Sequence, residues 1–195
     1  MPVTLQSLTG AEILPAIDAL AALRMRVFAE WPYLYDGDEA YERDYLREFI
    51  AAPGAVLVLA SDGDTIVGAA TASPMLAQKP AFYAPFAERG IDVRSLFYFG
   101  ESVLLPTYRG QGVGHGFFDH REAQARAQGA AACTFAAVVR PANHPRRPAN
   151  HRPLDAFWGK RGYAPMEGLT ASMDWKDHDD ACETAKSMQF WVKHL

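Results

Sequence analysis

The feature that most constrains the fold of this chain is a run of alternating glycines, Gly110, Gly112 and Gly114. The apolar segment 96–105 before it predicts a buried strand, and the segment 112–128 after it predicts a helix. The first N–H groups of a helix have no partner within the helix, and glycines allow an anion to approach them closely. A strand, a glycine-rich turn and a helix in this order therefore predict a cradle for a phosphate or pyrophosphate group.

The spacing of these glycines excludes two common phosphate-binding motifs. The dinucleotide motif GxGxxG would need a glycine in place of His115 or Phe117. The nucleotide-binding loop GxxxxGK would need a lysine, and the sequence has none between Lys79 and Lys160.

The pattern that fits is [Arg/Gln]-x-x-Gly-x-Gly, which begins at Arg109. Farther along the chain, residues 157–163 (FWGKRGY) form a second pattern, aromatic-aromatic-x-Lys-x-Gly-aromatic. Both motifs, in this order, resemble those of the GNAT superfamily of N-acetyltransferases, and the element order over residues 3–163 is similar to that of the family. The resemblance implies that the first motif binds the pyrophosphate of acetyl-CoA.

The resemblance also implies the fold class: a mixed α/β domain with a central, mostly antiparallel, twisted sheet and helices on both faces. Hydrophobic periodicity and turn residues predict strands over 3–8, 55–60, 65–73, 96–105, 132–139 and 170–175. They predict helices over 11–29, 39–50, 112–128, 154–161 and 183–195, with irregular loops over 74–94 and 140–153. We expect a GNAT-like domain over residues 1–175 and a helical extension over 176–195.

Composition narrows the class of partner. The length of 195 residues suits one domain with its own core. Lysine and arginine total 19 against 23 acidic residues, and this net charge of −4 argues against a nucleic-acid binder. No apolar run approaches the roughly 18 residues that a membrane span needs. Cys133 and Cys182 lie far apart, and no signal peptide is visible, so we expect reduced thiols and a cytoplasmic location.

The resemblance assigns the cosubstrate to two stretches of chain. The strand end is expected to bond the pantetheine arm through its backbone, and the turn is expected to hold the pyrophosphate. The residues concerned are Val103, Leu104, Leu105, Arg109, Gly110, Gln111, Gly112, Val113 and Gly114. Asn150 lies near the asparagine that often contacts the arm in this family, and Trp158 lies in the second motif.

Glu101 is the candidate catalytic residue. Strand alternation puts it on the face of Phe97, Phe99, Val103 and Leu105. A carboxylate on an apolar face is costly unless it is paired or neutralised, and such a group suits a general base acting on an ammonium acceptor. The family often has its base at this position. The alternative is a structural carboxylate that is hydrogen-bonded to backbone or to an arginine.

Trp158 departs from the family pattern. Many members have a tyrosine there, which acts as an acid toward the departing CoA thiolate. An indole cannot protonate a thiolate at neutral pH, so Tyr163, Tyr108 or water would have to replace it. The departure motivates a second hypothesis, that the chain is a catalytically idle acyl-CoA sensor.

The acceptor is expected to be a primary amine of a small molecule or peptide. Residues 31–39 combine aromatic and acidic side chains in a region that usually lines the acceptor pocket of the family, and both attract a cation. The arginines of the loop 140–152 could instead bind the 3′-phosphate of CoA, an acidic acceptor, or only water.

No metal is expected, because His115 and His120 are five residues apart on a helix and face different directions, and His120 is expected to be a core residue. The segment 188–195 carries two adjacent aromatic residues, Phe190 and Trp191, which are expected to pack either on their own domain or on a second subunit in a homodimer.

Overall fold

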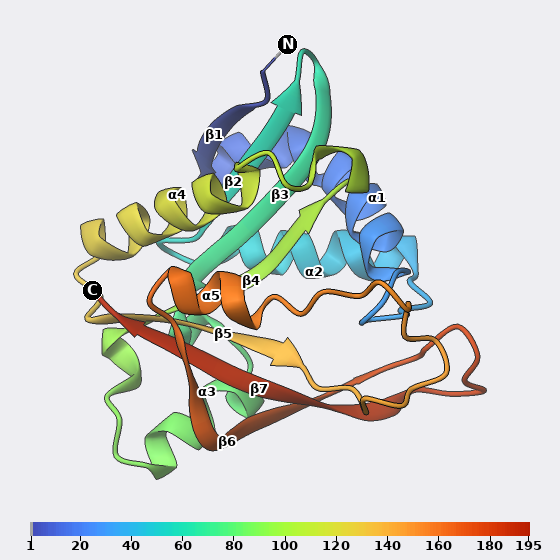
Figure 1. Cartoon of the computed structure of the whole chain (residues 1–195). Coiled ribbons are helices and arrows are strands. Elements are labelled where there is room, and N and C mark those ends of the chain that lie inside the picture. The colour runs from blue at the N-terminus through green and yellow to red at the C-terminus, as the bar shows by residue number, and fades with distance from the viewer. Residues whose placement is uncertain (1) are drawn as a thin grey trace.

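The fold is a single seven-stranded sheet flanked by helices, as seen in a computed structural model that describes residues 2–195 (Figure 1). The strands lie in the order β1-β2-β3-β4-β5-β7-β6. All neighbours are antiparallel except β4 and β5, which are parallel. The strands are β1 (Thr4–Thr9), β2 (Val56–Asp62), β3 (Thr65–Pro74), β4 (Leu96–Leu104), β5 (Ala132–Val138), β6 (Ala164–Trp175) and β7 (Thr184–His194). This is the mixed, mostly antiparallel sheet that the sequence predicts.

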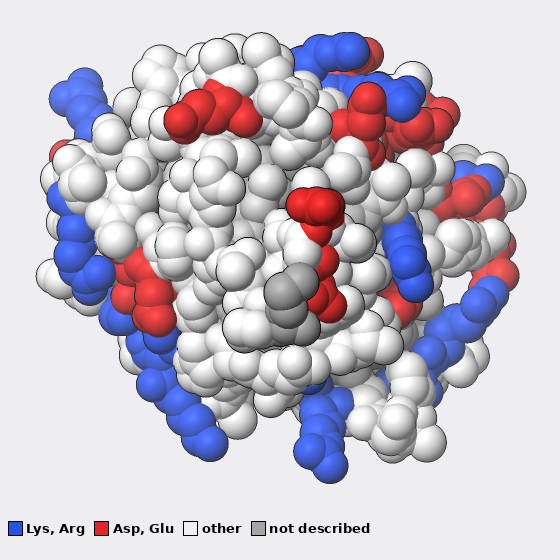
Figure 2. Space-filling model, turned by 90° about the horizontal axis from the view of Figure 1, so that it is seen from above, with Lys and Arg blue, Asp and Glu red and all other residues white. Residues whose placement is uncertain are grey.

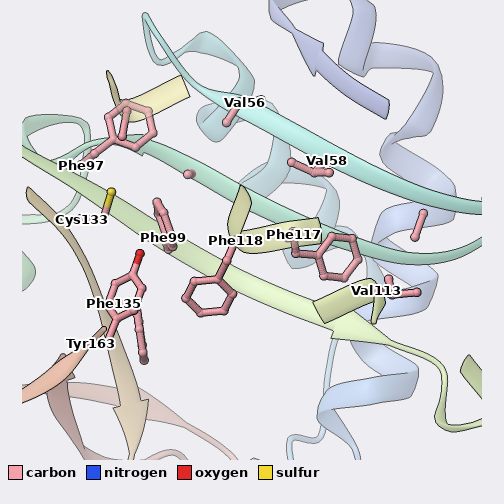
Figure 3. Close-up of a cluster of buried hydrophobic side chains, with 14 of the residues drawn as sticks. Val56, Val58, Phe97, Phe99, Val113, Phe117, Phe118, Cys133, Phe135 and Tyr163 are labelled. Atoms are coloured by element: carbon pink, nitrogen blue, oxygen red, sulfur yellow. The ribbon is translucent and has the colours of Figure 1, made fainter. Parts of the chain in front are cut away.

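The helices cover both faces of the sheet, also as predicted. They are α1 (Ile17–Phe28), α2 (Glu39–Ala51), α3 (Pro80–Glu88), α4 (Val113–Ala127) and α5 (Asp155–Lys160). Helix α4 buries Phe117 and Phe118 on one face, in the cluster that Figure 3 shows. Helices α1 and α2 bury Leu20 and Leu46 on the opposite face. In Figure 1, α4 lies in front of the sheet, and α1 and α2 lie behind it.

The first predicted helix, over 11–29, begins in a different form. Residues Gly10–Ala16 are a 3-10 helix, and the α-helix starts only at Ile17. Pro15 lies in this first stretch, and a proline has no N–H with which to continue an α-helical hydrogen-bond ladder. Thr9 and Glu12 form the expected capping box at the start.

The segment 74–94 is not an irregular loop. It contains α3, which begins at Pro80, and two short 3-10 turns, Met75–Ala77 and Val93–Ser95. A proline is compatible with the first turn of a helix, because the N–H it lacks would have no partner there. The helix buries Phe86 against the sheet, and this apolar contact outweighs the prolines that suggested a loop.

The predicted helical extension over 176–195 is wrong, because residues Thr184–His194 form strand β7. Lys186, Met188 and Phe190 are buried at every second position, which is the period of a strand rather than of a helix. Strand β7 pairs with both β5 and β6, so it lies inside the sheet. Phe190 and Trp191 are buried by their own chain.

Charge is spread over the surface. Figure 2 shows one face, on which acidic and basic side chains are interspersed among uncharged ones. Within residues 2–195, none of the helices has the length and apolar character needed to cross a membrane.

Candidate functional site

The two parallel strands at the centre of the sheet separate soon after they meet. Strand β4 pairs with β5 only over Leu96–Tyr98, opposite residues 132–134. Beyond Tyr98 the two strands diverge, and β4 continues to the turn that leads into α4 (Figure 1). A strand edge without a partner offers its backbone N–H and C=O groups to a ligand.

A β-bulge lies where this divergence begins. Ala70 pairs with Ser102 and Ala72 pairs with Phe99, so β4 carries one extra residue opposite Thr71. The backbone N–H of Glu101 donates a hydrogen bond to Oγ1 of Thr71 over 3.2 Å. A Cβ atom on Gly100 would lie 2.5 Å from that oxygen, so the bulge requires a glycine there.

The bulge corrects the predicted orientation of Glu101. Phe97 and Phe99 pack on the face covered by α4, whereas Val103 packs with α1 and α2 on the other face. The Glu101 side chain meets Arg24 of α1, so it also lies on the α1–α2 face. The single face predicted for residues 97–105 is therefore wrong, because the extra residue shifts the alternation by one position.

The glycine turn, defined here as residues 109–114, has the backbone that its sequence predicts. Gly110 and Gly112 have φ angles of +76° and +87°, in the left-handed region that favours glycine. Gly112 is the N-cap of α4. A Cβ atom on either glycine would have no neighbour within 4 Å, so open space adjoins the turn at the positive end of the helix.

The polar side chains of the glycine turn hold the turn itself. The guanidinium of Arg109 donates to the carbonyl of Leu104 over 3.1 Å and pairs with Glu30 at 3.0 Å. The amide of Gln111 donates to the carbonyl of Thr107 over 2.9 Å. These contacts hold the shape of the turn, and the backbone N–H of Arg109 is also bonded, to the carbonyl of Pro106.

The two sequence motifs meet in space. Phe157 of α5 lies beside the start of α4, with its ring centroid 4.9 Å from that of His115. Trp158 packs on Phe135 of β5 and Trp191 of β7, at centroid distances of 5.0 and 5.1 Å. Val113 is buried in the core beneath the turn, and Val103 is buried near the end of β4.

Two further predicted residues lie on the outside of this region. Leu105 follows β4 and packs partly on the cores of both faces. Asn150 is exposed in the loop between β5 and α5.

A cavity of about 290 Å³ lies on the α1–α2 face of the sheet. Its wall is mostly aromatic and acidic, and α1, α2, α3, β4, β6 and β7 all contribute to it. The predicted segment supplies Tyr33, Tyr35, Asp36 and Asp38, and the bulge supplies Gly100 and Glu101. Sequence reasoning missed the remaining lining, which includes Arg24, Glu42, Tyr45, Tyr98, Trp175 and Met188. One feature of the sequence could have identified Arg24 as a buried residue: it lies four residues after Leu20, on the buried stripe of its helix.

Glu101 lies at the floor of the cavity and belongs to a buried cluster of charges. Its side chain is 4% exposed, and its Oε1 lies 2.7 Å from Nη1 of Arg24. The hydroxyl of Tyr45 donates to its other oxygen over 3.4 Å. Arg24 also binds Glu42 through Nε in a short hydrogen bond. Glu101 is therefore paired with an arginine, as the structural alternative predicts, and it also lines the cavity; its role as a base stays a prediction.

The phenols around this cluster are held neutral. Burial, followed by the negative charge of Glu101, raises the pKa of Tyr33 to about 12. The same two causes, in the same order, raise the pKa of Tyr45. Burial, followed by the charge of Glu42, raises the pKa of Tyr35. Burial raises the pKa of Tyr98 well above its ordinary value. These groups are weaker acids than ordinary tyrosines.

The two tyrosines suggested as replacements for Trp158 are engaged elsewhere. The hydroxyl of Tyr163 donates to Glu122 over 3.3 Å, and that of Tyr108 donates to Asp62 over 3.0 Å. Neither residue lines the cavity.

The histidines and arginines of the loop 139–154 mostly contact protein. His144 and His151 pack on the ring of Trp31, at centroid distances of 5.0 and 5.8 Å. Arg140 forms two hydrogen bonds to Asp177, of 2.8 and 2.9 Å, and donates to the carbonyls of the segment 32–33.

His120 is half-buried rather than a fully buried core residue. Its Nδ1 lies 2.7 Å from the hydroxyl of Ser7. In the part of the chain that the structure describes, no three or more metal-ligating side chains come together.

Comparisons with known proteins identify a family and a shared fold. Residues 21–152 match the model of the acetyltransferase (GNAT) family. A search of curated protein sequences found no match. Among solved structures, ribosomal-protein-alanine N-acetyltransferase from Brucella melitensis is similar over 98% of this chain and 99% of its own, with a TM-score of 0.64 and 14% identity.

Two further solved structures are similar along their whole length. An N-acetyltransferase from Staphylococcus aureus Mu50 has a TM-score of 0.64 and 12% identity, over 100% of this chain and 99% of its own. PaiA N-acetyltransferase from Thermoplasma acidophilum, solved in complex with coenzyme A, has a TM-score of 0.56 and 12% identity over 100% of both chains. At these identities the likeness shows a shared fold.

Proposed function

The chain belongs to the acetyltransferase (GNAT) family, and we propose that it moves the acetyl group of acetyl-CoA to a primary amine of a small molecule or peptide by direct attack. One observation carries the proposal. The bulge at Gly100 turns Glu101 into a cavity at the point where β4 separates from β5. A carboxylate, a free strand edge and a glycine turn thus follow one another within residues 101–114.

We assign acetyl-CoA to the free edge of β4 and the glycine turn. The backbone of Val103, Leu104 and Leu105 would bond the pantetheine arm, as an added strand would. The groups used would be other than the Leu104 carbonyl, which accepts from Arg109, and the Leu105 N–H, which donates to the Val67 carbonyl. The N–H groups of the turn and of the first residues of α4 would bind the pyrophosphate, since the helix dipole favours an anion there. Support comes from the positive φ angles and empty surroundings of Gly110 and Gly112.

We assign the role of general base to Glu101. The acceptor would arrive as an ammonium ion and give one proton to the carboxylate, directly or through water. The free amine would then form a bond to the thioester carbonyl carbon, and the C–S bond would break. The nitrogen would lose a further proton as the amide forms, and the thiolate would gain one. Thiolate is a tolerable leaving group, so this step does not require a tyrosine at position 158.

The idle-sensor hypothesis is less well supported. A module that only senses acyl-CoA needs no second cavity, yet Glu101 lies at the floor of one beside the proposed cosubstrate edge. Trp158 packs against β5 and β7, so its bulk has a structural use whatever the chemistry. We also expect the enzyme to act in the cytoplasm, where Cys133 and Cys182 would stay reduced; both are free thiols.

The first test is thermal unfolding with saturating acetyl-CoA, CoA, ATP or NAD, each in turn. A ligand at 100 times its dissociation constant adds about 2.7 kcal/mol of stability. For a chain of this size that raises the midpoint by roughly 5–10 °C. We expect a shift with both CoA species and none with ATP or NAD, and mass spectrometry should then detect acetylated amines. The proposal fails if neither CoA species shifts the midpoint.

A further inference from the structure

The floor of the cavity holds more negative than positive charge. Glu42 and Glu101 are both buried, with side chains 1% and 4% exposed, and Arg24 lies between them at 10%. These three groups carry a net charge of −1 when both carboxylates are ionised. Buried charge without a counter-charge is costly, so a cluster of this kind attracts a cation.

The guanidinium of Arg24 is already paired with two carboxylates. Its Nε binds Glu42, and its Nη1 lies 2.7 Å from Glu101. Its central carbon lies 4.5 Å from the centroid of the Tyr45 ring and 5.1 Å from that of Phe28. The positive charge of Arg24 is therefore already outweighed by the carboxylates of its own chain when a ligand arrives.

Both carboxylates have one oxygen, Oε1, that is buried and receives no well-formed hydrogen bond from the described residues. Glu42 has no exposed surface, whereas Glu101 retains a little. After burial, the charge of Glu42 and then a hydrogen bond to it raise the pKa of Tyr35, which also lines the cavity. Glu42 thus lies behind the cavity surface and adds negative charge there, whereas Glu101 reaches the surface itself.

The other charged residues that line the cavity do not reverse its excess of negative charge. Lys176 is paired with Asp36 at 2.7 Å, which leaves Lys79 as the other cation of the lining. The other carboxylates of the lining are Asp38, Asp174 and Glu183. Aromatic rings complete the wall, and their faces also attract cations.

We propose that the cavity selects acceptors that enter as ammonium ions with no carboxylate beside the amine, and that Glu42 sets this selection. The inference rests on the proposed function and narrows its substrate class to alkyl and arylalkyl amines rather than free amino acids. A carboxylate beside the reacting nitrogen would lie close to the negative charges of Glu101 and Glu42, and Arg24, the one buried cation among the described residues of the lining, is already paired with both. Glu42 also balances the charge of Arg24 when Glu101 takes up a proton.

Three matched ligands test the selection in the unaltered protein. 2-Phenylethylamine, phenylalanine amide and phenylalanine share a ring and a primary amine, and only the last carries a carboxylate. Their binding to the complex with CoA is measured by calorimetry, which needs no turnover. We expect phenylalanine to bind at least about tenfold more weakly than the other two, because like charges in a partly buried site repel strongly. The amide controls for size. Equal or tighter binding of phenylalanine would overturn the inference.

The variant Glu42→Gln tests the residue. It keeps the shape of the side chain and makes the floor neutral, so we expect the ratio of kcat/KM for 2-phenylethylamine over phenylalanine amide to stay the same. The ratio of 2-phenylethylamine over phenylalanine should fall about tenfold or more. Glu42→Asp should restore most of the selectivity, and Glu48→Gln, an exposed position on the same helix, should leave it unchanged. Unaltered selectivity in folded Glu42→Gln would remove Glu42 from this role.

The outcomes separate this inference from the proposed function. If CoA does not bind, the proposed function fails, and the three ligands are measured on the protein alone, where the same order supports the charge selection and equal or tighter binding of phenylalanine overturns it. If CoA and the amine bind in the expected order but no amide forms, the charge selection stands and catalysis does not. If phenylalanine binds and is acetylated as well as the amine, the proposed function stands and the selection is wrong. The comparison of the three ligands in the unaltered protein tests the charge selection even if Glu42→Gln does not fold.

Discussion

The glycine turn and the cavity, the two regions of the proposed site, are built in different ways. The turn consists of consecutive residues and presents backbone N–H groups, so a short motif describes it almost fully. The cavity is assembled from side chains of helices and strands that lie far apart in the sequence, and its character depends on which charges meet there. If the proposed assignments hold, acetyl-CoA binding is encoded in local sequence, whereas the choice of acceptor depends on tertiary packing.

The largest effect is expected from a change where the two regions meet. Glu101→Gln keeps the shape of the side chain but removes the base, so kcat should fall by at least about 100-fold. Affinity for acetyl-CoA should stay within about twofold, because the glycine turn is untouched. Initial rates and calorimetry measure the two quantities. Full turnover near neutral pH in this variant would exclude Glu101 as the base.

A change at the bulge should affect both stability and rate. In Gly100→Ala the new Cβ would lie 2.5 Å from Oγ1 of Thr71, so the strand must shift. We expect a loss of about 1–3 kcal/mol of unfolding free energy. A displacement of Glu101 by about 1 Å should lower kcat tenfold or more. Denaturant unfolding and initial rates give both values.

The double variant Gly100→Ala/Thr71→Ala serves as the control for this clash. It removes the obstructing hydroxyl and should recover part of the lost stability. A double variant no more stable than Gly100→Ala alone would mean that the backbone of the bulge, rather than the Thr71 hydroxyl, limits the position.

A smaller effect is expected at the turn itself. Gly112→Ala puts a side chain at a φ of +87° and into the open space beside the helix start. Acetyl-CoA should bind about tenfold more weakly, and the strain should cost about 1–2 kcal/mol. Gly90→Ala is the matched control, since Gly90 has a φ of +73°, equally open surroundings and a position outside the site. If both variants weaken acetyl-CoA binding equally, strain rather than the cradle explains the loss.

The smallest effect concerns the protons of the cavity. Burial raises the pKa of Tyr33 to about 12, and burial also raises the pKa of Tyr35, Tyr45 and Tyr98. A raised pKa in the folded state gives stability that is complete below the unfolded value near 10 and is lost as pH rises toward the folded value. Absorbance at alkaline pH should therefore show fewer ionised tyrosines in the folded protein than in urea. If all eight tyrosines ionise together near pH 10, the cavity is open to water.

The sequence predicts most of the fold because most helices and strands show the spacing of hydrophobic residues that is typical of them within their own residues. It fails where two signals conflict. The prolines of the segment 74–94 predict a loop where α3 lies. The segment 183–195, which contains the aromatic pair at 190–191, is predicted as a helix where β7 lies. In the site, the glycines predict the turn, but Gly100 lies within the predicted strand 96–105 and gives no sign of a bulge there. A bulge is defined by the partner strand, so the orientation of Glu101 could not be read from its own neighbours.

The charged floor escaped sequence reasoning for a related reason. Arg24 and Glu42 belong to separate helices, and each looks like an ordinary polar residue when its helix is taken alone. They form an ion pair only once α1 and α2 have packed on the sheet. Only then do Arg24, Glu42 and Glu101 form a cluster with one excess negative charge.

The order of the strands in the sheet also determines the order in which they can pair during synthesis. Strand β6 joins the sheet only through β7, which is the later of the two in the chain. A nascent chain can therefore pair β1 to β4 and form the glycine turn while β6 still has no partner. Trp175 and Met188, which close one side of the cavity, take their positions only when residues 184–194 have left the ribosome. During synthesis, the turn that we assign to the acyl donor can thus form before the cavity that we assign to the acceptor is complete.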